Sequence, residues 1–257
     1  MSTPVEIFTR TFHNITNRFS VVNSLRHVAE LGLPEVIPGI YQEWLQFAHQ
    51  LFNDPQYDHL FLDKEGAIRE GGGIQSMGRM MAENQLLAFR SSVEAASLVF
   101  AHSILDSAAM DYLRVTALQG PNDWSEDVNG KQVPLSAIQR KTYDDLLKEK
   151  VSQHLETFDR QSLLVKVDKL FQVCRPEQGF APMDDYAFDR TRLEQLDSLR
   201  HEIVHGSGPV NEIRVTDNDI WFLHKTAFFL MSLVNMRYDT RIDTARFEAG
   251  AATPKRA

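Results

Sequence analysis

Apolar residues recur every three or four positions along much of the chain, which is the spacing of one face of an α-helix. The longest such stripe predicts one helix over about residues 80–118. Small residues, mostly Ala and Ser, flank this stripe and favour the close approach of a second helix. Gln119, Gly120 and Pro121 then end the helix. The stripe consists of Phe89, Val93, Ala96, Phe100, Ile104, Ala108, Tyr112 and Val115.

Further stripes predict four helices in the second half of the chain. Ser136 and Ser162 are candidate N-caps for the first two, and Thr216 with Asp219 suggests a cap for the last. Gly206 is expected to stop the third helix, as a glycine just beyond the last turn does. The expected buried faces are Tyr143, Leu147, Val151, Leu155 and Phe158; Leu163, Leu164, Val167, Leu170 and Phe171; Leu193, Leu196, Leu199 and Ile203; and Ile220, His224, Ala227, Met231, Val234 and Tyr238.

The first 75 residues follow a less regular pattern. Two shorter helical stripes lie near Phe19–Leu31 and Ile40–Leu51, and the triple glycine Gly71–Gly73 is a candidate hinge or linker. The alternation of apolar and polar residues that marks strands is almost absent from the chain. The sequence therefore predicts an all-α protein.

Composition limits the classes of function. Hydrophobic residues make up 43% of the 257 residues, enough for a sizeable core. The net charge of −8 argues against nucleic-acid binding by bulk electrostatics, but it does not exclude a small local binding site. The single cysteine, Cys174, has apolar neighbours and is expected to be a core thiol. The N-terminus has no signal-peptide pattern, and we expect no membrane span and a cytoplasmic protein.

The stretch Leu199–Gly206 contains the candidate catalytic residues, and it matches two known motifs. From His201 it is H-E-x-x-H, the zinc-protease pattern, in which His201 and His205 share a helix face and Glu202 is the general base. The position of a third zinc ligand is occupied by Asn211, a poor ligand, and such proteases usually carry a sheet beside this helix. A zinc hydrolase is therefore a minor alternative.

From Arg200 the same stretch is R-x4-H followed by Gly, which resembles the signature of the HEPN superfamily, many of whose members cleave RNA. The resemblance includes the long helix around Ser91–Asp106 and the short helix Leu163–Phe171, and it covers about residues 80–238. It implies a HEPN-like four-helix bundle core at 80–238, an N-terminal helical extension at 1–79 and a C-terminal tail at 239–257.

The resemblance implies a metal-independent endoribonuclease that needs no cofactor. Its catalytic residues would be Arg200, His205 and His201. The neighbouring 2′-OH of RNA would attack the phosphate and leave a 2′,3′-cyclic phosphate. His205 suits the proton transfer, because histidine changes charge near neutral pH, and Arg200 suits the stabilisation of the phosphorane-like transition state. His201 would orient the phosphate, and Glu202 has no required role.

A homodimer is also implied, because HEPN nucleases bring two Arg/His sets into one cleft. Arg200 and His205 lie about 140° apart around one helix, which makes this arrangement plausible. The setting implied is a toxin or antiviral defence, with an antitoxin or another protein as a possible partner beside RNA.

Several alternatives stay open from the residues alone. Arg200 could pair with Asp197 or Glu194 on its own helix, His205 could be a helix-end histidine, and His201 could simply be exposed. The other histidines near apolar stripes, His102 and His224, are interpreted as partly buried core residues. The alternative function is a non-catalytic HEPN-like module that binds RNA, a nucleotide or a protein, which the acidic balance favours.

Overall fold

The computed structural model describes residues 2–56, 72–128, 141–206 and 214–243, and within these ranges every regular element is a helix. The prediction of an all-α protein is confirmed. The candidate cap Ser136, Gly71 and the tail beyond residue 243 lie outside these residues, whereas Gly72 and Gly73 of the candidate linker begin a helix. The helices are α1 (Pro4–Asn53), α3 (Gly72–Gln119), α4 (Ser125–Val128), α6 (Tyr143–Leu155), α7 (Leu163–Cys174), α8 (Arg190–His205) and α9 (Asp217–Tyr238), with 3-10 turns η2 (Pro121–Trp124) and η3 (Glu156–Arg160).

The chain forms two compact units that are interleaved along the sequence. The first unit comprises Met1–Ser20, Phe100–His201 and Asp217–Ala257, and the second comprises Val21–Val99 and Glu202–Thr216. Because neither unit is one continuous segment, this division does not test linear boundaries at residues 79 and 238, which stay predictions.

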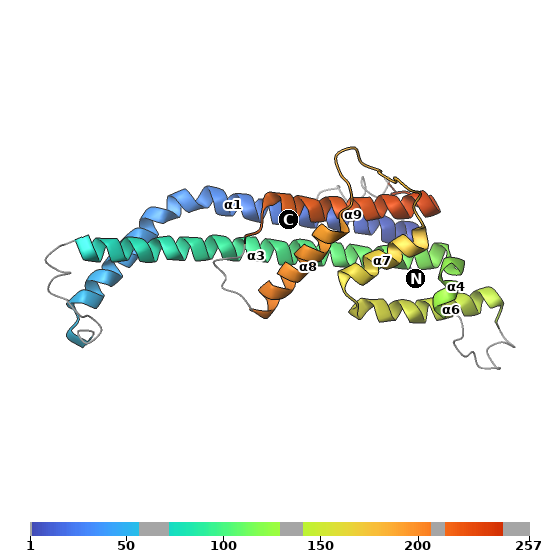
Figure 1. Cartoon of the computed structure of the whole chain (residues 1–257), viewed down its shortest axis with the longest axis horizontal. Helices are drawn as coiled ribbons and strands as arrows, with labels where there is room; N and C mark the ends of the chain where they lie inside the picture. The colour runs from blue at the N-terminus through green and yellow to red at the C-terminus, as the bar shows by residue number, and fades with distance from the viewer. Residues whose placement is uncertain (1, 57–71, 129–140, 207–213, 244–257) are drawn as a thin grey trace, which may run out of the picture. The chain divides into compact units, whose positions relative to one another are not determined.

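The core of the first unit forms where the start of α1, the second half of α3 and α9 pack together (Figure 1). Tyr112 of α3 is completely buried, its ring lies 6.0 Å from that of Phe8, and its hydroxyl donates to the Ala227 carbonyl at 3.1 Å. Phe12 of α1 contacts Phe228 of α9 with ring centroids 5.9 Å apart. Buried aromatic side chains therefore hold together three helices that are distant in sequence, and such side chains contribute strongly to the stability of a core.

The predicted stripe on α3 is confirmed in its second half and wrong in its first. Ile104, Tyr112 and Val115 are buried, whereas the side chains of Phe89 and Phe100 are 49% and 63% exposed. The stripe spans 26 residues in seven steps, slightly more than 3.6 residues per step, so it turns by about 80° around the helix. Residues at one end of such a stripe can therefore face the core while residues at the other end point away from it.

The N-terminal helix differs from the two short helices expected there. α1 is a single helix of 50 residues that continues through Gly32, Pro34, Pro38 and Gly39. Within the second unit it packs closely on α3, because a Cβ added to Gly78 would lie only 3.1 Å from the Cα of Leu45. This contact stabilises α1 after the Gly and Pro positions, where helix propensity is low.

Helix α3 also bears on the expectation of no membrane span. Its segment Gly78–Gln119 is long and apolar enough to cross a membrane, but 56% of the apolar window is buried inside the structure. Burial against other helices is the ordinary reason for such apolarity in a core helix.

The predicted start of α7 and the predicted end of α8 are confirmed. Ser162 caps α7 by accepting a hydrogen bond from the Val165 amide at 3.4 Å, and Cys174 at its other end is buried, which raises the pKa of the thiol to about 12. Leu193 and Leu196 hold α8 in the core. The helix ends at His205, and Gly206 follows with φ +62°, the left-handed conformation expected of a helix-stopping glycine.

The two conformations of glycine give a paired stability prediction. Gly206→Ala should lower the free energy of unfolding by about 1 kcal/mol, because an L-residue resists positive φ. Gly32→Ala should raise it by about 0.5–1 kcal/mol, because this glycine lies in a helix and a Cβ there meets no atom within 4 Å. The midpoints of urea unfolding measure both effects, and shifts of the same sign would contradict the assigned backbone conformations.

Candidate functional site

A polar cavity of about 460 Å³ lies entirely within the first unit. Its walls come from the middle of α3, from η3 and the start of α7, and from the C-terminal half of α8. Both Arg200 and His201 line it. The structure thus places two of the three predicted site residues on one cavity, together with residues that the sequence did not single out.

Arg200 is available to a ligand in this cavity. Its Nε atom is buried and has no hydrogen-bond partner among the described residues. The two acids that could have paired with it have other partners, since Asp197 bonds to His102 at 2.7 Å and Glu194 pairs with Arg190 at 3.5 Å. The alternative in which Arg200 belongs to an ion pair on its own helix is therefore not what the structure shows within the described ranges.

His102 and Asp197 form a bonded pair across α3 and α8. The Nε2 atom of His102 lies 2.7 Å from Oδ1 of Asp197, and the two side chains are 7% and 27% exposed. Burial lowers the pKa of His102, and it outweighs Asp197, which favours the protonated form. His102 is indeed buried, as interpreted from the sequence, but it also lines the cavity and has a carboxylate partner.

A second pair joins α7 to α3 at the cavity. The side chain of Lys166 is only 2% exposed, and its ammonium group donates to both carboxylate oxygens of Asp106 at 2.8 Å. Nothing in the local pattern distinguishes Lys166 from a surface lysine, so this contact could not be predicted from the sequence. The two carboxylates on the cavity wall, Asp106 and Asp197, are therefore each bonded to a basic side chain.

The remaining electrostatics favour an anion. Arg160 lines the cavity beside Arg200, and no ion pair involves it in the described part of the chain. The N-terminus of α7, capped by Ser162, also opens here and contributes the positive end of a helix dipole. Two guanidinium groups and a helix N-terminus suit a phosphate more than any neutral ligand.

The structure does not bring His205 to this cavity. His205 and Glu202 are exposed and belong to the second unit, and neither lines the cavity. Across the described residues no three His, Cys, Asp or Glu side chains are grouped as metal ligands, and Asn211, at the third position of the zinc pattern, lies outside those residues.

His224 behaves as the core histidine that the sequence predicted. Its ring stacks on Phe19 with centroids 4.5 Å apart, and burial is the main cause that lowers its pKa, with Lys225 a smaller one. It does not line the cavity, which makes it a useful control for His102.

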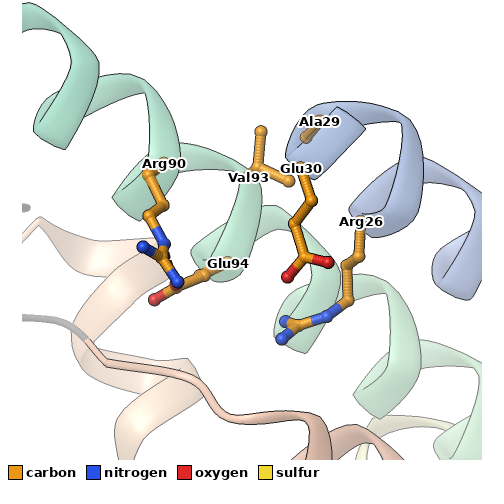
Figure 2. Close-up of a pocket in the computed structure, with 6 residues that line it drawn as sticks. All are labelled: Arg26, Ala29, Glu30, Arg90, Val93 and Glu94. Carbon is orange, nitrogen blue, oxygen red and sulfur yellow. Dashed lines mark hydrogen bonds and ion pairs between the residues drawn. The ribbon is translucent and has the colours of Figure 1, made fainter. Parts of the chain in front are cut away.

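A smaller cavity of about 220 Å³ lies in the second unit, between α1 and α3. Figure 2 shows Arg26 and Glu30 on α1 facing Arg90 and Glu94 on α3. Glu94 pairs with Arg90 at 3.3 Å and accepts the Val215 amide at 3.4 Å, and Arg26 donates to the Val215 carbonyl at 3.5 Å. These balanced charges hold the segment before α9, so this cavity is interpreted as structural.

Comparison of the chain with protein families, with curated proteins and with solved structures found no match in any of the three.

Proposed function

We propose that the protein is a metal-independent endoribonuclease of the HEPN type, with its active site in the cavity of the first unit. The observation that carries the proposal is Arg200, whose buried Nε has no partner among the described residues and which lies beside His201 on a polar cavity. A fixed positive charge without an internal partner is what stabilisation of a phosphorane-like transition state requires.

The order of the helices also supports the proposal. The HEPN resemblance implies a long helix, a helical hairpin, the motif helix and a closing helix. Here the long α3 comes first, α4, α6 and α7 follow it, and the motif helix α8 and the closing helix α9 come last. Arg160 and the N-terminus of α7 suit the binding of the scissile phosphate or a neighbouring one.

The acidic net charge of −8 favours a small RNA site over an extended one. In the cavity the charge of Asp106 is offset by Lys166, and Arg160 and Arg200 together outweigh the charge of Asp197. A partner protein that delivers RNA, or an antitoxin that withholds it, would suit a chain with so little basic surface.

Cleavage of single-stranded RNA in the presence of EDTA is the direct test. Wild-type protein should leave 2′,3′-cyclic phosphate ends, and Arg200→Ala should slow cleavage about 100-fold, because it removes charge stabilisation in the transition state. Arg190→Ala is the matched control on the same helix, since Arg190 pairs with Asp168 on the surface, and it should keep wild-type activity. RNA binding without any cleavage would replace the nuclease proposal with the binding-module alternative.

Glu202→Gln separates the nuclease from a zinc hydrolase. A zinc mechanism needs Glu202 as the base on metal-bound water, whereas the proposed mechanism keeps most of its activity without that carboxylate. Activity that is lost in Glu202→Gln, retained in Arg200→Ala and accompanied by about one zinc per chain would contradict the proposal.

The dimer implied by the resemblance has its own test. Light scattering should give about twice 29.4 kDa. If Arg200 and His205 from different protomers form one site, Arg200→Ala and His205→Ala should each be inactive alone. Mixing them should then restore roughly a quarter of the wild-type activity, because half of the dimers would be mixed and each would hold one intact site. A mixture as inactive as its components would show that the site does not combine these residues across protomers.

A further inference from the structure

We infer that His102, oriented by Asp197, is the general base of the cavity and takes the proton from the 2′-OH of bound RNA. This inference rests on the proposed ribonuclease function and adds to it a catalytic residue and a positioning residue outside the R-x4-H motif. It starts from the fact that His102 is the buried histidine on the cavity wall and Asp197 lies one turn before Arg200 on α8.

The bond between the two side chains determines which nitrogen of His102 is basic. An ionised carboxylate can only accept hydrogen bonds, so Nε2 of His102 carries a hydrogen and donates it to Oδ1 of Asp197. In neutral imidazole the other nitrogen, Nδ1, then holds the lone pair, and no described residue hydrogen-bonds to it. A base for an incoming hydroxyl needs a lone pair of this kind.

The charges that face His102 come from three helices. Asp197 and Arg200 lie on α8, Asp106 lies one turn along α3, and Lys166 on α7 neutralises Asp106. Arg200 and burial both lower the pKa of His102, while Asp197 raises it without overcoming burial. His102 is therefore neutral at neutral pH, the form in which a base accepts a proton.

The proposed step conserves atoms and charge. The 2′-oxygen forms a bond to phosphorus, its proton passes to Nδ1 of His102, and the bond from phosphorus to the 5′-oxygen breaks. The leaving 5′-oxygen takes a proton from His201 in its imidazolium form, and Arg200 stabilises the extra negative charge on the phosphoryl oxygens. The products are a 2′,3′-cyclic phosphate and a 5′-hydroxyl, and His102 and His201 then exchange protons with water.

Asp197 has a positioning function in this scheme. It fixes the ring orientation and the tautomer of His102, and it stabilises the imidazolium that forms when the proton is taken, as a carboxylate behind a catalytic histidine does. Asp197 raises the pKa of His102, so its loss should lower that pKa further. A carboxylate with a purely structural role would not link the pH dependence of cleavage to position 197.

The experiment compares full-length His102→Gln, Asp197→Asn and the control His224→Gln. His224→Gln removes a buried histidine outside the cavity and should leave cleavage within about threefold of wild type. His102→Gln should slow cleavage of a random-sequence single-stranded RNA by about 100-fold or more. It should still bind a random-sequence single-stranded DNA of the same length, which lacks the 2′-OH and is not cleaved, with a Kd within about twofold of wild type.

The pH profile distinguishes catalysis from structure. Cleavage by wild type should fall as the pH drops through the pKa of His102, and Asp197→Asn should move this acid limb to lower pH while it lowers the plateau rate. NMR of histidine ring carbons in the whole protein should show the His102 titration moving in the same direction. An unmoved limb and an unmoved titration would overturn the role of Asp197 even if His102→Gln fails to fold.

The outcomes for the two proposals are separate. If wild-type protein cleaves no RNA, the proposed function fails. If wild type cleaves and a folded His102→Gln cleaves equally well, the proposed function stands and His102 is not the base. If His102→Gln loses DNA binding together with cleavage, His102 shapes the binding site instead, which also overturns the inference.

Discussion

The ion pair between Lys166 and Asp106 is the contact on which the cavity depends. Lys166 lies in the first turn of α7, almost wholly buried, and its ammonium bonds to both oxygens of a carboxylate on α3. A buried ammonium without its partner is far less stable than one that is paired, so α7 is held at one position along α3. That position brings the Ser162 cap, the preceding Arg160 and the helix N-terminus to the wall of the same cavity.

The ends of the helices were predictable from the sequence where a single residue determines the local backbone. Glycine at position 206 predicted the end of α8 because few other residues adopt positive φ, and Ser162 predicted the start of α7 because its hydroxyl satisfies a free amide. Continuous α1 was not predictable, since Gly32 and Pro38 disfavour a helix locally, and the close contact with α3 lies further along α1, at Leu45. The stripe on α3 failed at Phe100 because its spacing drifts around the helix.

Some residues of the candidate site were likewise predictable from the sequence, and others were not. Arg200 and His201 were found because they belong to one motif on one helix, and the structure places both on the cavity. His102 was recognised only as a buried histidine, since its partner Asp197 lies 95 residues away on another helix. A sequence shows the spacing of residues along a helix, but it does not show which faces of distant helices meet.

The acidic composition argues against an RNA-cleaving function, but the charges around the cavity weaken this argument. On the cavity wall the charge of Asp106 is offset by Lys166, whereas a neutral His102 does not offset the charge of Asp197. What a phosphate would meet is the local balance, in which Arg160 and Arg200 outweigh Asp197 beside a helix N-terminus. A low overall affinity for nucleic acid is compatible with this local balance, because the phosphate contacts that a small site makes are few and a partner can supply the rest.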